Sequence, residues 1–250
     1  MFGASPSGDA GLSSLRPSGK GNKTKEPDFG TYHHSTPAAS KKIRVIIKTM
    51  FTDALTSLPL RSDEVLGILD VGCGLGFLSC TSAEFYENAK IIGIDTFKHA
   101  SLKNSSPERA NENARTLGFS DRIIFKNEDV FKFTPAEKFD VIISNLVFHN
   151  FEKRRFKAYS HLSSWTHDRS FVVIGDLFFS LKTDITYLSN IFRILKVIKP
   201  KNNFRQYALL VMSKDSRPHR MDQAHKYSSN RPHPTVSLGG SPFFQDVNRI

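Results

Sequence analysis

The feature that most constrains this sequence is an apolar run that leads directly into a glycine-rich turn. Residues 68–80 read Ile-Leu-Asp-Val-Gly-Cys-Gly-Leu-Gly-Phe-Leu-Ser-Cys. The apolar part carries one acid, Asp70, and the residues after the glycines return to helical spacing. This pattern predicts a buried strand, a tight turn and the first turn of a helix. Because glycine has no Cβ, the backbone N–H groups of such a turn can approach a ligand closely.

Short apolar runs alternate with segments of helical spacing along most of the chain. Strands are expected at 65–71, 90–95, 122–129, 139–145, 170–176, 194–199 and 204–212. Helices are expected to begin at Thr36-Pro37 and to cover 75–86, 105–117, 150–165 and 184–192. Strands that alternate with helices and are apolar throughout indicate an α/β fold, with a mostly parallel sheet covered on both faces. The short connection at 200–203 predicts that the last two strands form an antiparallel pair.

The two ends of the chain differ in composition from its middle. Gly, Pro, Ser and Lys dominate the start, and Pro, His, Arg and Ser dominate the end. We therefore expect a flexible polar segment at 1–35, one domain at 36–213 and a flexible basic tail at 214–250. The first segment lacks the apolar core of a signal peptide, and no apolar run approaches the length of a membrane span.

Cysteine content and charge limit the function classes further. The two cysteines, at positions 73 and 80, have no zinc-like spacing with histidines, so we expect reduced thiols, no metal site and a cytoplasmic location. The formal charge is +11, and residues 37–213 hold 25 of the 35 basic and 18 of the 24 acidic residues. A basic surface suits an anionic partner such as RNA. The basic groups at 153–157 and 196–205 also have an ordinary explanation, as a solvated helix face and a protected strand edge. We favour this explanation over RNA binding.

Polar side chains stand at the ends of the predicted strands, in chain order. They are Asp70, Asp95, Asp129, Asn145 and Asp176. Any one of them could be an ordinary loop or helix-cap residue. Because ligands of open parallel sheets bind at the carboxyl ends of the strands, the whole series behind a glycine turn predicts a binding site there.

Two nucleotide-type ligands compete for this site. A dinucleotide fingerprint needs Gly-x-Gly-x-x-Gly, and counting from Gly72 its third glycine falls on Phe77, which argues against a nicotinamide-dependent oxidoreductase. The spacing is instead Asp70-x-Gly72-x-Gly74-x-Gly76. This spacing resembles motif I of the Rossmann-like S-adenosylmethionine-dependent methyltransferases.

The resemblance covers roughly residues 36–214. Asp95 stands where that family has the acid that binds the ribose hydroxyls, and Asp129 where it has an acid facing the adenine amino group. The resemblance implies a seven-stranded, mostly parallel sheet with an antiparallel final pair, and S-adenosyl-L-methionine as cofactor. The implied cofactor-binding residues are Asp70, Gly72, Cys73, Gly74, Gly76, Asp95, Asp129, Val130 and Asn145.

Methyl transfer from a sulfonium requires mainly alignment, and a general base is needed only where the acceptor must lose a proton. His149 and Asn145, just after the fourth strand, are the candidate catalytic residues. Tyr32, His33 and His34 precede the first helix, which in this family often folds over the cofactor pocket, so they are candidates for acceptor binding. An ordinary surface or helix-entry role is the alternative for each histidine.

The acceptor is the least determined part of the prediction. Methyltransferases of exocyclic base amines often carry Asn-Pro-Pro-Tyr or Asp-Pro-Pro-Tyr after the fourth strand, whereas residues 144–149 read Ser-Asn-Leu-Val-Phe-His without proline. A small-molecule acceptor is therefore favoured. The alternatives are an RNA methyltransferase that uses the basic surface and a non-catalytic module that binds cofactor or RNA. The sequence does not indicate an oligomeric state.

Overall fold

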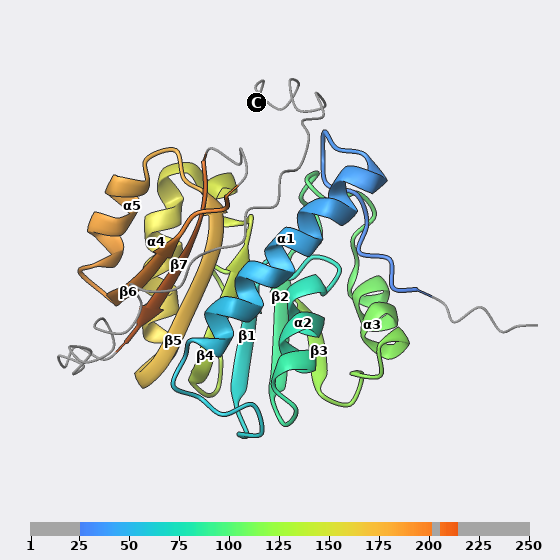
Figure 1. Cartoon of the computed structure of the whole chain (residues 1–250), viewed down its shortest axis with the longest axis horizontal. Coiled ribbons are helices and arrows are strands. Elements are labelled where there is room, and N and C mark those ends of the chain that lie inside the picture. The colour runs from blue at the N-terminus through green and yellow to red at the C-terminus, as the bar shows by residue number, and fades with distance from the viewer. Residues whose placement is uncertain (1–25, 202–205, 215–250) are drawn as a thin grey trace, which may run out of the picture. The chain divides into compact units, whose positions relative to one another are not determined.

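A computed structural model describes residues 26–201 and 206–214, which include a seven-stranded sheet of order β3-β2-β1-β4-β5-β7-β6 (Figure 1). The strands are β1 (Gly67–Val71), β2 (Lys90–Asp95), β3 (Ile123–Asn127), β4 (Phe139–Asn145), β5 (Thr166–Leu177), β6 (Arg193–Ile198) and β7 (Tyr207–Ser213). The helices are α1 (Pro37–Thr56), α2 (Phe77–Phe85), α3 (Pro107–Thr116), the 3-10 helix η1 (Phe148–Arg154), α4 (Arg155–Ser164) and α5 (Leu181–Leu188).

The sheet has the mixed topology that the sequence predicts. Strands β1 to β5 pair in parallel, and β7 pairs antiparallel with both β5 and β6. The α/β fold with an antiparallel final pair is therefore confirmed. Since β1 lies between β2 and β4, at the centre of the five parallel strands, the glycine turn that follows it opens at the middle of their carboxyl edge.

Side chains that alternate along the strands fill two separate cores. Ile68 of β1 belongs to the core beneath α1, α2 and α3, and the next residue, Leu69, belongs to the core beneath α4 and α5. Figure 1 shows α1, α2 and α3 together on one face of the sheet. Because both faces are covered, strands such as β4 are buried at most of their positions.

The region after β4 departs from the prediction. A single helix was expected over 150–165, whereas the chain forms η1 and α4, with a break inside η1 at Glu152. The backbone of Glu152 has φ 48° and ψ −127°, a conformation outside the helical region. The short η1 segment therefore has an orientation of its own, and it carries His149.

The chain before α1 is bound to the domain. Thr36 caps α1 by accepting a hydrogen bond from the backbone N–H of Ala39 at 3.1 Å, as its position before Pro37 predicts. Upstream, the Arg44 guanidinium donates to the carbonyls of Phe29 and Gly30. The described residues thus begin ten positions before the predicted domain boundary at 36. The rest of the predicted N-terminal segment, and the tail from residue 215 onward, lie outside the described residues.

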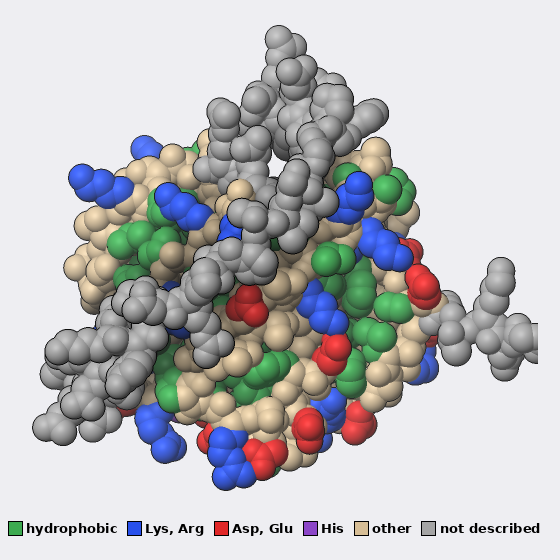
Figure 2. Space-filling model, viewed as in Figure 1, with side chains coloured by type: hydrophobic (Ala, Val, Ile, Leu, Met, Phe, Trp, Pro, Cys, Tyr) green, Lys and Arg blue, Asp and Glu red, His purple; other side chains and the backbone are tan. Residues whose placement is uncertain are grey.

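Over the lower and right-hand parts of the face that Figure 2 shows, Lys and Arg side chains are interspersed with Asp and Glu side chains, whereas Lys and Arg side chains alone are visible at its upper left. Among the helices described, none combines the length and apolar character that a membrane crossing requires.

Two glycines in the left-handed region allow a test of how tightly the turn is packed. Gly76 (φ 81°) and Gly118 (φ 78°) have the same backbone conformation, but a Cβ on Gly76 would lie 2.5 Å from the ring of Phe125, whereas a Cβ on Gly118 would contact nothing within 4 Å. We expect Gly118→Ala to cost about 1–2 kcal/mol of unfolding free energy from the backbone alone. Gly76→Ala should cost about 1–3 kcal/mol more, because the ring must move. Urea unfolding of both variants measures the difference, and equal losses would contradict the packing described.

Candidate active site

The glycine turn after β1 is held against the end of β2 by hydrogen bonds. The backbone N–H groups of Gly72 and Cys73 donate to the carbonyl of Ile94 at 2.8 and 3.1 Å, and that of Gly74 donates to Oδ2 of Asp95 at 3.0 Å. Gly72 and Gly74 both have positive φ, 73° and 52°, which glycine adopts without strain. The side chain of Asp95 thus ties the turn to the strand end from which it projects.

The segment that follows β4 packs directly on this turn. A Cβ added to Gly72 would lie 2.2 Å from Cγ2 of Val147, so no other residue type fits there without displacing Val147. Glycine at position 72 is therefore explained by packing between two loops of the site.

Two predicted cofactor-binding residues have buried side chains. The carboxylate of Asp70 is 1% exposed and accepts a hydrogen bond from the Ser79 hydroxyl at 2.6 Å. Burial raises the pKa of Asp70 to about 7, against the effect of the Ser79 hydrogen bond. Burial also raises the pKa of the Cys73 thiol well above its ordinary value, so this thiol stays protonated and only the backbone of Cys73 takes part in the turn.

Asp95 and Asp129 stand on adjacent loops at the carboxyl edge, and both are partly exposed. Oδ1 of Asp95 accepts from the N–H of Phe97 at 2.7 Å, and Oδ1 of Asp129 accepts from the N–H of Phe131 at 2.9 Å. The N–H of Glu128 donates to the carbonyl of Asp95 at 3.0 Å and joins the two loops.

The chemistry of these acids fits a ligand rich in donors. Within residues 26–201 and 206–214, neither Asp95 nor Asp129 has an ion-pair partner, and each carboxylate retains acceptor capacity beyond its backbone bonds. Hydroxyl, amino and sulfonium groups are the complements of such acceptors. Val130, the third predicted residue here, is buried with its side chain in the core, so only its backbone can face a ligand.

His149 forms a close pair with Asp176, which the sequence placed at a strand end but did not connect with it. Nδ1 of His149 lies 2.6 Å from Oδ1 of Asp176, and the backbone N–H of His149 donates to Oδ2 at 3.2 Å. Asp176 is 1% exposed, and the His149 side chain is 20% exposed. Because the carboxylate accepts the proton on Nδ1, the lone pair of Nε2 points away from Asp176 and is available as a base.

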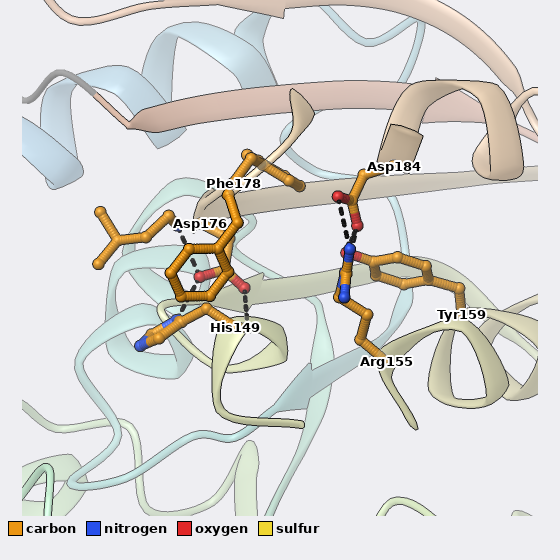
Figure 3. Close-up of a pocket in the computed structure, with 8 residues that line it drawn as sticks. His149, Arg155, Tyr159, Asp176, Phe178 and Asp184 are labelled. Carbon is orange, nitrogen blue, oxygen red and sulfur yellow. Dashed lines mark hydrogen bonds and ion pairs between the residues drawn. The ribbon is translucent and has the colours of Figure 1, made fainter. Parts of the chain in front are cut away.

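The pair lines one side of a small pocket, and a second polar group lines the other side (Figure 3). There, Arg155 donates to both oxygens of the buried Asp184, from Nε at 2.7 Å and from Nη2 at 3.2 Å, and the Tyr159 hydroxyl donates to Oδ1 at 3.1 Å. The space between these groups has no room for even a water molecule, far below the roughly 300 Å³ at which ligand pockets begin. We therefore assign these walls to the positioning of His149, not to holding a cofactor.

Asn145, at the end of β4, is bound to the last strand of the chain. Its Oδ1 accepts a hydrogen bond from the Tyr207 hydroxyl at 2.7 Å. Tyr207 was expected only as part of a strand, because no local pattern in the sequence distinguishes it from its apolar neighbours.

Three residues before α1 were predicted to bind the methyl acceptor. One of them lies over the glycine turn, and two lie on the surface. Tyr32 pairs as an isolated antiparallel bridge with Leu102, whose Cδ2 would lie 3.0 Å from a Cβ on Gly74, so this segment lies over the glycine turn. His33 and His34 are exposed, with ring centroids 3.7 Å apart. The structure therefore places Tyr32 over the glycine turn and the two histidines on the surface.

Comparison with known proteins identifies relatives that share this fold. A family model described as "Methyltransferase domain" matches residues 62–206. Malonyl-[acyl-carrier protein] O-methyltransferase 2 of Ilyobacter polytropus is 26% identical over 144 residues, covering 56% of this chain and 52% of that protein. A tRNA1(Val) (adenine(37)-N6)-methyltransferase of Vibrio campbellii is 31% identical over 83 residues, covering 33% of this chain and 32% of that protein. The chain thus spans about half or less of the length of these curated relatives.

Solved structures agree on the fold. Magnesium protoporphyrin IX methyltransferase from Synechocystis PCC 6803, determined with bound S-adenosylhomocysteine, superposes with a TM-score of 0.57 at 18% identity, covering 72% of this chain and 89% of that one. An N-methyltransferase from Bradyrhizobium japonicum WM9 superposes with a TM-score of 0.54 at 16% identity, covering 68% and 97%.

The raised pKa of Asp70 predicts a pH-dependent stability. Between its ordinary pKa of 3.8 and the folded value of about 7, the folded protein holds a proton that the unfolded chain has lost. Unfolding therefore releases a proton, and stability falls as pH rises through this range. Asp70→Asn removes the titration, so its stability relative to the wild type should rise by about 2–3 kcal/mol between pH 5 and pH 8.

Urea unfolding at several pH values measures this difference, and a difference that does not change with pH would contradict it. Ser79→Ala provides the matched control. It removes a hydrogen bond that favours the carboxylate, so the fall in stability should extend to higher pH.

Proposed function

Since the chain belongs to the methyltransferase domain family, whose model matches more than half of it, we propose that it transfers a methyl group from S-adenosyl-L-methionine to a small-molecule acceptor. The observation that supports the proposal is that hydrogen bonds join the glycine turn, Asp95 and the loop of Asp129 at the carboxyl edge of the sheet. These groups present carboxylate oxygens and a bare backbone to one region, as a cationic nucleoside with an amino acid end requires.

Five of the predicted residues are assigned a role in holding this cofactor. We assign Asp95 to the ribose hydroxyls, Asp129 and the backbone of Val130 to the adenine edge, and Gly74 to the amino acid end. Asp70 lies buried behind the turn, so its effect on the ammonium of the cofactor is electrostatic and grows as its carboxyl ionises. When bound, S-adenosyl-L-methionine supplies an electrophilic methyl group on a sulfonium.

His149 is the residue we assign to proton removal from the acceptor. Its Nδ1 is engaged by Asp176, and that buried carboxylate stabilises the imidazolium that forms when Nε2 takes a proton. Such a pair is useful when the methyl acceptor keeps its proton until it attacks the methyl group.

Two observations favour a small molecule over RNA. Arg155, the member of the basic group at 153–157 that lines the pocket beside His149, is neutralised by Asp184. On the lower and right-hand parts of the face shown in Figure 2 the basic side chains are interspersed with acidic ones, whereas RNA binding is favoured by a continuous basic surface. The two cysteines are free thiols, which supports our proposal of a cytoplasmic location.

The acceptor class can be tested without knowing the acceptor. The protein is incubated with S-adenosylmethionine carrying a labelled methyl group and with cell extract, and the products are separated into RNA, protein and small molecules. Label in the small-molecule fraction is the expected result. Label in RNA would support the alternative that uses the basic surface, and binding of cofactor without any label would indicate a non-catalytic module.

The role of Asp95 predicts a loss of cofactor affinity. Asp95→Ala removes the acceptor for the ribose hydroxyls and a bond to the glycine turn, so calorimetry should show S-adenosylmethionine binding at least tenfold weaker. Asp168→Ala is the matched control, because Asp168 is an exposed acid in the first half of β5. Unchanged affinity in the Asp95 variant would overturn the assignment of the site.

The role of His149 predicts a loss of turnover without a loss of cofactor. His149→Gln should lower kcat for the labelled acceptor fraction by about 10²- to 10⁴-fold, the usual contribution of a general base, with cofactor affinity within twofold of wild type. His167→Gln is the matched control, because His167 also pairs with an aspartate, Asp140, but lies near the start of β5, at the opposite end from Asp176; it should leave kcat unchanged. A kcat in the His149 variant equal to that of the control would exclude the base.

A further inference from the structure

The bond between Asn145 and Tyr207 is built into the register of three strands. Asn145 of β4 pairs with Gly175 of β5, and Leu177 of β5 pairs with Tyr207 of β7. The Tyr207 hydroxyl crosses over Gly175 to reach Oδ1 of Asn145 at 2.7 Å. A Cβ on Gly175 would lie 2.1 Å from that hydroxyl and 3.0 Å from Oδ1 of Asn145. Glycine at position 175 therefore leaves the space that this hydrogen bond occupies.

The hydroxyl determines which end of the Asn145 amide faces the site. Tyr207 is 3% exposed, and burial raises its pKa well above the ordinary value, so the hydroxyl is protonated and donates. The carbonyl end of the amide is therefore turned toward Tyr207. Because the amide group is planar, its NH₂ end points away from Tyr207 and offers two donors at the carboxyl end of β4.

Hydrogen-bond donors at this position suit one type of methyl-accepting atom. An exocyclic amine donates its own N–H and needs an oxygen opposite it, and here it would have to share the carbonyl of Asn145 with the Tyr207 hydroxyl, which already occupies one of the two lone pairs. A hydroxyl oxygen can accept from the Asn145 NH₂ while its proton goes to His149. A carboxylate acceptor is already ionised near neutral pH and would give the His149–Asp176 pair no proton to remove.

We propose that Tyr207 is a positioning residue that holds the Asn145 NH₂ toward the acceptor, and that the methylated atom is the oxygen of an alcohol or phenol. This inference rests on the proposed function and names its substrate class. The acceptor oxygen forms the new bond to the methyl carbon, the S–C bond breaks with its electron pair on sulfur, and the hydroxyl proton passes to Nε2 of His149. The products are a methyl ether, neutral S-adenosylhomocysteine and a protonated imidazole.

The positioning role is tested by a double-mutant cycle on the full chain. Tyr207→Phe keeps the buried ring and removes the donor, and it should lower kcat for the labelled small-molecule fraction at least tenfold. Asn145→Ala should do the same, and the double variant should be no slower than Asn145→Ala alone, because Tyr207 acts through Asn145. A Tyr207 that matters only for packing would lower kcat equally in both backgrounds, which would overturn the role.

Two measurements separate this effect from damage to the fold. Calorimetric affinity for S-adenosylmethionine should stay within twofold of wild type in each variant. Tyr86→Phe is the matched control, because Tyr86 is a fully buried tyrosine whose hydroxyl contacts the carbonyl of Leu55 at 3.4 Å, in the core beneath α1 and α2. It should leave kcat unchanged.

The substrate class is tested by the linkage of the transferred methyl group. Labelled products from the extract are treated with mild alkali, which releases methanol from methyl esters, and then with hydriodic acid, which releases methyl iodide from methyl ethers. Label that resists alkali and leaves with hydriodic acid supports a hydroxyl acceptor. Label released by alkali, or resistant to both, overturns the hydroxyl assignment and leaves the proposed function intact. A chain that binds the cofactor and labels nothing refutes the proposed function, and the acceptor assignment falls with it.

Discussion

The site depends on the hydrogen bonds that hold the glycine turn to the end of β2. The carbonyl of Ile94 accepts from two consecutive N–H groups of the turn, and the carboxylate of Asp95 accepts from a third. Without this attachment, a turn rich in glycine would have many conformations of similar free energy. With it, the turn, β2 and the loop that carries Asp129 form one rigid edge, since Glu128 binds the carbonyl of Asp95 in turn. Three loops distant in sequence thus have fixed relative positions before any ligand binds.

Local sequence patterns predicted some features of this edge. The apolar runs that give β2 and β4, the cap at Thr36 and the acids at strand ends follow from periodicity and from single-residue preferences. The break at Glu152 could not be predicted this way. A glutamate with φ 48° and ψ −127° contradicts the preference of its own side chain, so only contacts formed after folding can hold it there.

Side-chain pairs between residues of different strands could not be predicted from the sequence, for a different reason. His149 and Asp176 are 27 residues apart, and Asn145 and Tyr207 are 62 residues apart. Each pairing depends on a strand register, and a shift of one residue would turn Tyr207 to the other face of the sheet. Gly175 gave the one available signal, since a glycine inside an otherwise bulky apolar strand marks a close approach by another group.

Backbone strain around η1 connects these features to catalysis. Leu146 (φ 57°) and Glu152 (φ 48°) lie on either side of His149, and such conformations cost on the order of 1–3 kcal/mol each for residues other than glycine. Hydrogen bonds hold both ends, from the N–H of Leu146 to the carbonyl of Gly175 at 2.8 Å and from Arg155 to the carbonyl of Glu152 at 2.7 Å. Arg155 is itself fixed by the buried Asp184, so the ion pair beside the pocket stabilises the backbone that presents His149. The polar cluster of Arg155 and Asp184 is thereby explained as the support that keeps His149, the proposed base, over Asp176.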